Sequence, residues 1–238
     1  MGRKRPELTP GKAHHDMPEI TRISRMGFVN CYLVPEDDGF TLVDTMLPRS
    51  GGKIVAAAEG VGLPIVRIAL THAHGDHIGS VDELHKLLPD AEVIISARDA
   101  RLMAKDMSLD ADEPQGKLRG SYPGASTRPT RTVSDGDMIG SLRVIASPGH
   151  TPGHVAFLDT RDGTLLCGDA FATLGGVATT AKGVPLFPLP AVATWDKPTE
   201  LQSARSLCAL APARLAPGHG KVVASPVPAM ERAVARGA

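Results

Sequence analysis

Short apolar runs separated by Gly, Pro and Asp turns predict strands and helices in the first part of the chain. Residues 28–34 and 40–44 are β-branched and aliphatic, and the turn-forming segment between them predicts a β-hairpin. The Ala-rich residues 51–60 have a helical pattern that ends at glycine, and residues 65–70 are wholly apolar, as in a buried strand. The chain therefore opens with antiparallel β-structure and continues with a helix and an internal strand.

The alternation continues up to a long polar segment. Residues 78–88 are amphipathic and predict a helix, 92–95 predict a strand, and 97–105 predict a short helix. The apolar face of the first of these helices consists of Val81, Leu84, Leu87 and Leu88. Residues 107–129 are polar and rich in Gly and Pro, which is typical of a lid, a binding loop or a disordered segment.

The pattern after residue 130 predicts a second β-region followed by helices. The apolar segment 172–193 has no regular period, and we expect it to form a loop. The expected strands are 141–146, 155–159, 164–167 and 214–216, and the expected helices are 198–210 and 227–234.

Length and composition favour one domain. The 238 residues contain no Ser/Gly/Pro-rich linker, so we expect a single compact domain over residues 19–238. Residues 1–18 are polar and basic without an apolar core, which predicts a disordered tail and neither a secretory signal nor a membrane anchor. We expect His14 and His15 of this tail to be solvated.

Charge and cysteine content exclude several kinds of partner. The 26 basic and 26 acidic residues cancel and aromatic residues make up only 3% of the chain, so we expect no nucleic acid partner. Cys31, Cys167 and Cys208 are odd in number and lie in apolar segments, where a buried thiol is the ordinary state. We therefore expect a protein of a reducing compartment, the cytoplasm, with no membrane partner.

The segment directly after the apolar run 65–70 is dense in metal-ligand side chains. Three imidazoles and one carboxylate follow within six residues, namely His72, His74, Asp76 and His77. Such a density of nitrogen and oxygen ligands indicates a metal site. The alternative is structural: the histidines would lie on a solvated turn, and Asp76 would cap the following helix.

Three later turns repeat this design, each placing a ligand type just after an apolar strand and a Gly-containing turn. They deliver His150, Asp169 and His219. Five imidazoles and two carboxylates are too many for one four-coordinate ion, so we expect two divalent ions. A set without cysteine favours zinc, although iron and manganese also suit these ligands.

With these residues, the sequence resembles the metallo-β-lactamase-fold superfamily over roughly residues 28–223. The family pattern is H-x-H-x-D-H, followed at long intervals by a His, an Asp and a His, and every position is filled. The resemblance implies a mixed α/β (α+β) fold, a four-layer αββα sandwich of two mixed sheets flanked by helices, with the metals at one edge. One metal would be held by His72, His74 and His150 and the other by Asp76, His77 and His219, with Asp169 bridging.

The resemblance also implies the roles of further residues. Asp44 would lie behind the ligands and orient one of them, the alternative being a strand-end turn residue. His154 would support the site without binding metal. Asp76 and Asp169 would act in catalysis with a metal-bridging hydroxide. The activity implied is hydrolysis of a small carbonyl substrate, anionic or acyl-bearing, at a carboxylic ester, thioester or lactone bond.

Departures from individual branches of the family restrict the substrate. Only the run up to Ala238 follows His219, without the helical domain that glyoxalase-II-type thioesterases append, and Ala172 stands where lactonases of this fold carry Tyr. Asp169 counts against a β-lactamase, and 174–177 does not match the Arg-rich motif of persulfide dioxygenases. An iron-dependent redox enzyme and a β-lactamase-like amide hydrolase remain the alternatives to an ester, thioester or lactone hydrolase.

Two loops are expected to shape the substrate pocket, residues 107–129 and 171–195. The second contains Phe187, Leu189 and Trp195, whose apolar character suits an acyl chain. The alternative is that these side chains cover the core or form the contact of a homodimer.

Overall fold

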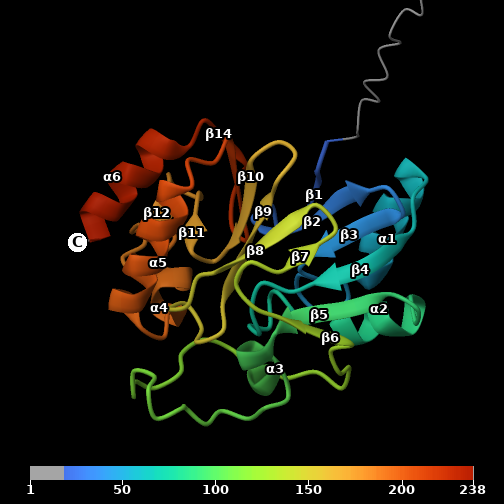
Figure 1. The fold of residues 1–238 in the computed structure, drawn as a ribbon, viewed down its shortest axis with the longest axis horizontal. Helices are drawn as coiled ribbons and strands as arrows, with labels where there is room; N and C mark the ends of the chain where they lie inside the picture. Colours follow the sequence, from blue (N-terminus) through green and yellow to red (C-terminus); the bar gives the residue numbers. More distant parts are fainter. Residues whose placement is uncertain (1–18, 238) are drawn as a thin grey trace, which may run out of the picture.

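A computed structural model describes residues 19–237 of the chain. The predicted tail, with His14 and His15, lies outside the described residues. Two six-stranded mixed sheets face each other, with helices on their outer sides (Figure 1). This four-layer arrangement confirms the αββα sandwich.

The first sheet contains six strands in chain order. Its strands are β1 (Thr21–Arg25), β2 (Val29–Glu36), β3 (Gly39–Val43), β4 (Ile65–Ala69), β5 (Glu92–Ser96) and β6 (Arg131–Val133). The first three pair antiparallel, which confirms the predicted hairpin, and β3 to β6 run parallel. The helices of this half are α1 (Gly51–Val61), α2 (Val81–Leu87) and α3 (Ala97–Met103).

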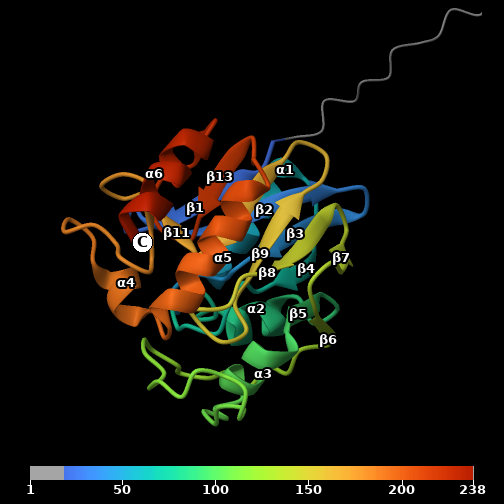
Figure 2. The same ribbon diagram turned by 60° about the vertical axis from the view of Figure 1, so that its left-hand side comes forward.

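The second sheet has the order β14-β13-β10-β9-β8-β7. Its strands are β7 (Met138–Ile139), β8 (Leu142–Ala146), β9 (Val155–Asp159), β10 (Thr164–Gly168), β13 (Arg214–Pro217) and β14 (Val223–Ala224). A small ribbon, β11 (Phe171–Ala172) with β12 (Ala178–Thr179), follows β10. The helices of this half are α4 (Leu189–Ala193), α5 (Lys197–Ala209) and α6 (Val227–Gly237), and Figure 2 shows α5 running across this sheet.

Three apolar layers hold the sandwich together. Because side chains alternate across a strand, β2 contributes Leu33 to the layer beneath the first helices and Val34 to the layer between the sheets. Phe157 of β9 meets Val34 in that middle layer, and Leu207 of α5 belongs to the third layer. Strands buried on both faces read as continuous apolar runs, which explains why several were recognisable from the sequence.

Some predicted elements were wrong in extent. α2 begins at Val81 and not at residue 78, so Asp76 lies in a turn before the helix and does not cap it. Leu87, expected on the apolar face, is 52% exposed, whereas Leu84 is buried. The segment 172–193, expected to be a loop, contains β12 and α4. The strands β1, β6, β7 and β14 were not predicted, because they are short or polar.

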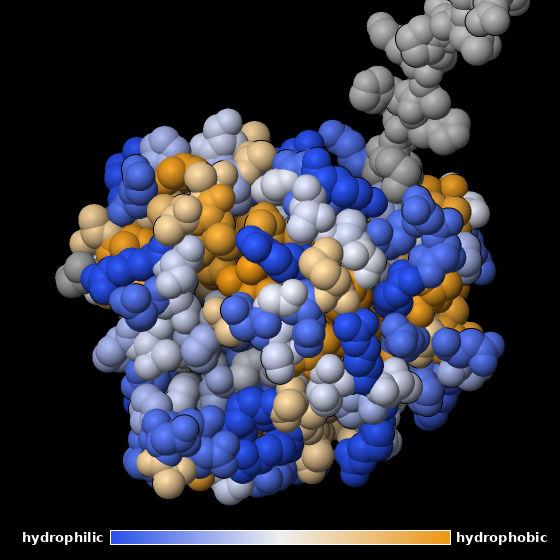
Figure 3. Space-filling view, viewed as in Figure 1, coloured by the Kyte–Doolittle hydropathy of each residue, from blue (hydrophilic) through white to orange (hydrophobic). Residues whose placement is uncertain are grey.

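The long segment between α3 and β6 is held in place by polar contacts. Arg98 pairs with Glu113 at 2.6 Å, and Arg101 pairs with Asp110 at 2.7 Å. Asp82 of α2 accepts hydrogen bonds from the backbone of residues 126 and 127. This segment lies at the lower left of Figure 1, where mainly hydrophilic side chains cover the surface (Figure 3).

Within residues 19–237, no helix is both long and apolar enough to span a membrane.

Candidate metal centre

The seven predicted ligands converge from four loops, each of which follows a strand. The segment with His72 to His77 follows β4, His150 follows β8, Asp169 follows β10 and His219 follows β13. Because β10 and β13 are parallel neighbours, their following residues lie at the same edge of the second sheet. The first sheet also holds the last loop in place, since the Asn30 side chain donates to the Pro217 carbonyl at 2.9 Å and to that of Gly220 at 2.7 Å.

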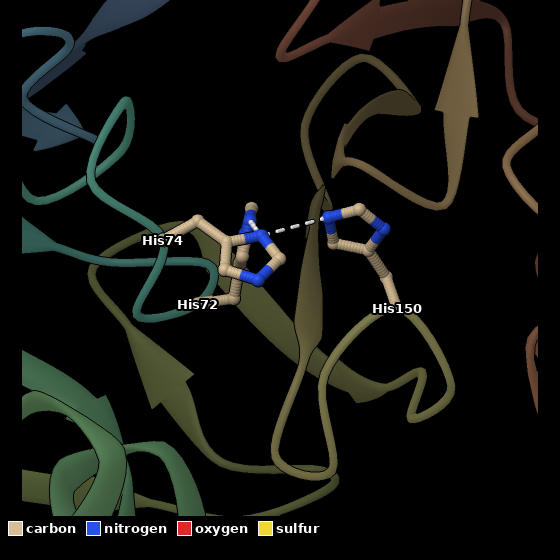
Figure 4. A group of neighbouring side chains, drawn as sticks. All are labelled: His72, His74 and His150. Atoms are coloured by element: carbon tan, nitrogen blue, oxygen red, sulfur yellow. Dashed lines mark hydrogen bonds between the residues drawn. The ribbon is translucent and has the colours of Figure 1, made fainter. Parts of the chain in front are cut away.

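Three histidines form the first group. His74 Nδ1 lies 3.1 Å from His72 Nε2 and 3.0 Å from His150 Nε2. Figure 4 shows these rings approaching each other from separate loops, with residues 72 and 74 on one and residue 150 on the other. All three side chains are buried, so the three nitrogens share one small enclosed space.

The second group consists of Asp76, His77 and His219, and Asp169 lies between the two groups. His219 Nε2 lies 3.2 Å from Asp76 Oδ2. Asp169 Oδ1 is 3.3 Å from His77 Nε2, and its Oδ2 is 3.2 Å from His219 Nε2 and 3.4 Å from His150 Nε2. The carboxylate of Asp169 therefore touches both groups, as a bridging residue must.

These separations suit metal coordination. Two ligands bonded to one tetrahedral ion at about 2.0–2.1 Å lie about 3.4 Å apart, close to the distances within both groups. Among the described residues, His77 Nε2 and Asp169 Oδ1 are buried and have no hydrogen-bond partner. Buried polar atoms without partners are costly, and a cation at this point would satisfy both. The residues therefore fit two divalent ions.

Hydrogen bonds on the opposite side of four rings leave one nitrogen of each ring free for the centre. Each outer nitrogen has a protein oxygen as its partner, which favours one tautomer and one ring orientation. The pairs are His72 Nδ1 with Thr71 Oγ1 at 3.0 Å, His74 Nε2 with the Arg119 carbonyl at 2.9 Å, His77 Nδ1 with Asp44 Oδ2 at 2.8 Å, and His150 Nδ1 with Thr194 Oγ1 at 3.0 Å.

Asp44 lies behind the ligands, where the resemblance placed it. It is buried, receives a hydrogen bond from His77, and accepts the Thr71 backbone N–H at 2.8 Å and the Thr71 hydroxyl at 2.8 Å. Its backbone is left-handed, with φ of 62°, a conformation that Asp and Asn tolerate better than most residues. Asp44 thus aligns the start of the ligand loop and one of its imidazoles.

His154 belongs to neither group. Its Nε2 accepts the backbone N–H of Asp169 at 3.1 Å, and its Nδ1 faces the Ser147 carbonyl at 3.1 Å. Both ring nitrogens are therefore engaged by the protein, and the ring supports the backbone that carries Asp169.

Asp99 connects the two loops that supply the first group, a role that no sequence pattern indicated. From the first turn of α3 its carboxylate accepts the backbone N–H of Ala73 and of Gly153 and the hydroxyl of Thr151, each at 2.8 Å. Acidic residues are common at the starts of helices because they interact favourably with the helix dipole, so Asp99 did not stand out in the sequence. Thr194 and the Arg119 carbonyl were missed as well, because neither lies near a ligand in the sequence.

Burial and charge divide the histidines into two classes. Burial lowers the pKa of His72 and of His150, and it lowers the pKa of His74 to about 4, so these imidazoles are neutral and able to bind metal. Burial also acts on His77 and His219, but neighbouring carboxylates together outweigh it and raise both pKa values: Asp169 with Asp44 at His77, and Asp169 with Asp76 at His219, whose pKa rises to about 9. A divalent cation would replace the protons held there.

A cavity of about 230 Å³ opens onto the centre. Its lining includes Phe187 and Leu189, as predicted, with Gly120 and Ser121 from the segment before β6. Trp195 does not line this cavity and is buried, as in the alternative expected for it; its indole N–H donates to the Gly116 carbonyl at 3.1 Å and so joins the two loops.

The sequence is similar to those of several known proteins. "Uncharacterized protein YobT" of Bacillus subtilis is 48% identical over 87% of this chain and 89% of its own length. "Probable metallo-hydrolase YflN" of the same organism is 31% identical over 79% of this chain and 78% of its own. A hydroxyacylglutathione hydrolase of Gloeobacter violaceus is 31% identical over 59% of this chain but only 48% of its own length.

The fold has solved counterparts as well. A crystal structure of TTHA1623 in a di-iron-bound form superposes with a TM-score of 0.64 and 28% identity, covering 88% of this chain and 96% of that one. The sequence pattern of the metallo-beta-lactamase superfamily matches residues 25–219, from β1 through the last ligand. The chain belongs to the metallo-beta-lactamase superfamily.

Proposed function

We propose that this protein is a binuclear metal-dependent hydrolase that cleaves a carboxylic thioester, ester or lactone. The observation that carries the proposal is Asp169, whose two carboxylate oxygens contact histidines of both ligand groups. Ions bound there would supply Lewis acidity, which polarises a carbonyl oxygen and lowers the pKa of water to about 7. The relatives named as hydrolases support this class of reaction.

Asp76 would act as the proton acceptor in this reaction. Asp76 lines the cavity, and its side chain is 34% exposed, so it is accessible to substrate as well as to metal. Burial raises the pKa of Asp76, but the hydrogen bond from His219 and the positive charges of His77 and His219 together outweigh burial and hold the pKa below its usual value. Asp76 is therefore a carboxylate at neutral pH and can accept the proton of an attacking water.

Zinc is the proposed metal, with iron as the alternative. Imidazole and carboxylate ligands suit both. The di-iron form of a structural neighbour shows that this fold accommodates iron in that protein.

The test combines metal analysis with a substrate screen. Protein produced in zinc- and iron-supplemented media should contain about two ions per chain and should release thiol or acid from simple thioesters, esters or lactones. Removal of metal with a chelator should abolish hydrolysis, and added metal should restore it. Metal-free protein with full activity, or metal-loaded protein that hydrolyses none of the three classes, would contradict the proposal.

The assignment of residues to two ions has its own test. His72→Ala and His77→Ala should each lower metal content, but predominantly at different ions, because the proposed assignment gives His72 to one ion and His77 to the other. The test is needed because the ligand atoms of these two residues also lie close to each other and to Asp169. Two distinct affinities in a chelator titration would identify which ion is lost. His85→Ala, on α2 and outside both groups, is the matched control and should retain both ions. Loss of the same single ion in both ligand variants would refute the division.

A further inference from the structure

We propose that the cavity beside the metal centre binds a neutral, apolar acyl group, so that the substrate is a lipophilic acyl thioester, ester or lactone. This inference rests on the proposed hydrolase function and specifies its substrate. It is carried by the walls of the cavity, by its rim and by the absence of Lys and Arg from its lining.

The cavity walls are apolar apart from the metal-ligand residues and one serine. Besides four residues of the centre and Ser121, the lining consists of Met26, Phe28, Val29, Leu47, Gly120, Phe187, Leu189, Pro190 and Ala193. Such a surface gains free energy by removing CH₂ groups from water and offers little to a polar group.

Two aromatic rings bring this apolar wall up to the centre itself. Phe28 and Phe187 lie edge to face with ring centroids 5.3 Å apart. The Phe187 ring is 5.5 Å from that of His219, and the Phe28 ring is 6.4 Å from it. An acyl chain beside these rings would therefore have its carbonyl end close to Asp76 and Asp169, which line the same cavity.

The rim also exposes large apolar side chains from two separate parts of the chain. Met26, in the turn between β1 and β2, is 71% exposed, and Leu189, at the start of α4, is 64% exposed. Apolar side chains gathered at the mouth of a cavity mark a binding surface for an apolar ligand.

Charge separates an apolar acyl group from an acidic one. No Lys or Arg is among the lining residues of this cavity. The cations of the neighbouring surface, Arg119 and Lys197, line a different depression on the side of Trp195. A carboxylate at the far end of the acyl chain would lose its hydration in this cavity and gain no ion pair, which disfavours it.

The experiment is a chain-length series on the metal-loaded protein. Thioesters of one small neutral thiol with acetyl, butanoyl, hexanoyl and octanoyl groups are compared by thiol release, together with the succinyl thioester. We expect kcat/KM to rise about two- to fourfold per methylene over the first steps, as burial of CH₂ groups predicts. Succinyl should be a poorer substrate than butanoyl. Calorimetric titration with octanamide and acetamide gives a readout independent of turnover, and only the former should bind.

Substitutions at the rim sharpen this test. Leu189→Lys places a cation at the cavity without disturbing the core, since this side chain is exposed. This variant should weaken the dependence of kcat/KM on acyl chain length. It should also raise the ratio of kcat/KM for the succinyl thioester to that for the butanoyl thioester about tenfold. Leu87→Lys introduces the same charge at an exposed leucine on α2, outside the cavity lining, and should change neither property.

Each other result has a defined meaning. A flat series, or preference for succinyl in the unsubstituted protein, would overturn the apolar acyl site while leaving the hydrolase intact. Light scattering would show whether Leu189→Lys converts a dimer to a monomer. If it does, and the dependence of kcat/KM on acyl chain length is unchanged, the rim is a subunit contact and the apolar acyl site is also overturned. Absence of turnover on every acyl substrate, with both ions bound, would overturn the hydrolase proposal itself.

Discussion

At the scale of single residues, the centre depends on the oxygen atoms behind the ligands. Four histidines have a fixed partner on the side away from the centre, and those partners are chemically diverse: two hydroxyls, a backbone carbonyl and a carboxylate. Each holds a ring so that its other nitrogen faces the centre. Such partners affect metal affinity nearly as strongly as the ligands do.

Asp44 offers a clean test of this dependence. Asp44→Asn keeps a residue that tolerates the left-handed backbone. It replaces the carboxylate that pairs with the His77 ring by a neutral amide. We expect affinity for the ion of the Asp76, His77 and His219 group to fall 10- to 100-fold, the range typical of such partners. Competition with a chromogenic chelator measures the change.

Asp38→Asn is the control for that variant. Asp38 pairs with Arg67 at the distant β2–β3 turn, so its loss should leave the affinity unaltered. Equal metal affinity of the Asp44 variant and the unsubstituted protein would show that Asp44 is only a turn residue at the end of the strand.

Asp99 predicts a pH dependence of stability. Burial raises the pKa of this carboxyl to about 6 from the ordinary 3.8, despite three hydrogen bonds to it. The folded state therefore holds this proton more tightly than the unfolded state. The contribution of this protonated carboxyl to the free energy of unfolding is fully present below about pH 4 and is lost as pH rises through 6. The shift in pKa corresponds to about 3 kcal/mol of stability.

Denaturant unfolding of the metal-free protein and of Asp99→Asn across this range isolates the effect. The stability advantage of the unsubstituted protein over the variant should shrink by about that amount between pH 4 and pH 7. A constant difference across the range would mean that the carboxyl titrates near its ordinary pKa in the folded protein.

At the scale of elements, the segment between α3 and β6 is part of the metal centre and not only of its surroundings. Its Arg119 carbonyl holds His74, and its Ser121 carbonyl accepts the Gly75 backbone N–H at 2.9 Å. Gly120 lies against the His74 ring with φ of +88°, and a Cβ there would be 2.4 Å from Nε2. Only glycine fits this approach.

Gly120→Ala should therefore displace either the loop or the imidazole. We expect affinity for the ion of the His72, His74 and His150 group to fall at least tenfold, with little change at the other ion. Gly116→Ala is the matched control in the same segment, since the nearest atom to its Cβ would be 3.9 Å away, on Trp195. Similar metal binding by both variants would show that the loop yields without moving His74.

The elements also explain which parts of the site were predictable. Each ligand directly follows a recognisable strand or turn, so local sequence was enough to nominate all seven residues and to place them at strand ends. Asp99 and Thr194 act on ligands far away in sequence, through the packing of α3 and the end of α4, and no local pattern reports such contacts. Phe187 and Leu189 were recognisable as pocket residues, whereas Met26 and Phe28 come from the opposite end of the chain.

At the scale of the whole molecule, the centre joins the two sheets. Residues 72 to 77 come from the first half of the chain and the other three ligands from the second, so bound ions would link the halves. A ligand that binds only the folded state at 100 times its Kd adds about 2.7 kcal/mol to stability. Removal of tightly bound metal should thus lower Tm by about 5–10 °C.

Calorimetry before and after chelation checks this expectation. Tm should rise again with added metal and should depend on its concentration, as linkage requires. His77→Ala should show a smaller chelator effect than the unsubstituted protein, because it has fewer ions to lose. A Tm indifferent to metal would mean that the sandwich is held by its apolar layers alone.

The division of strands between the sheets bears on how the protein is made. The first sheet uses residues 21–133 and the second uses residues 138–224, with no strand exchanged between them. During synthesis the first sheet can form while the second is still untranslated, yet the side of it that carries Tyr32, Val34 and Val43 has no partner until residues 138–224 emerge. Translation thus passes through a stage with an exposed apolar face, where chaperones or aggregation compete with completion of the fold.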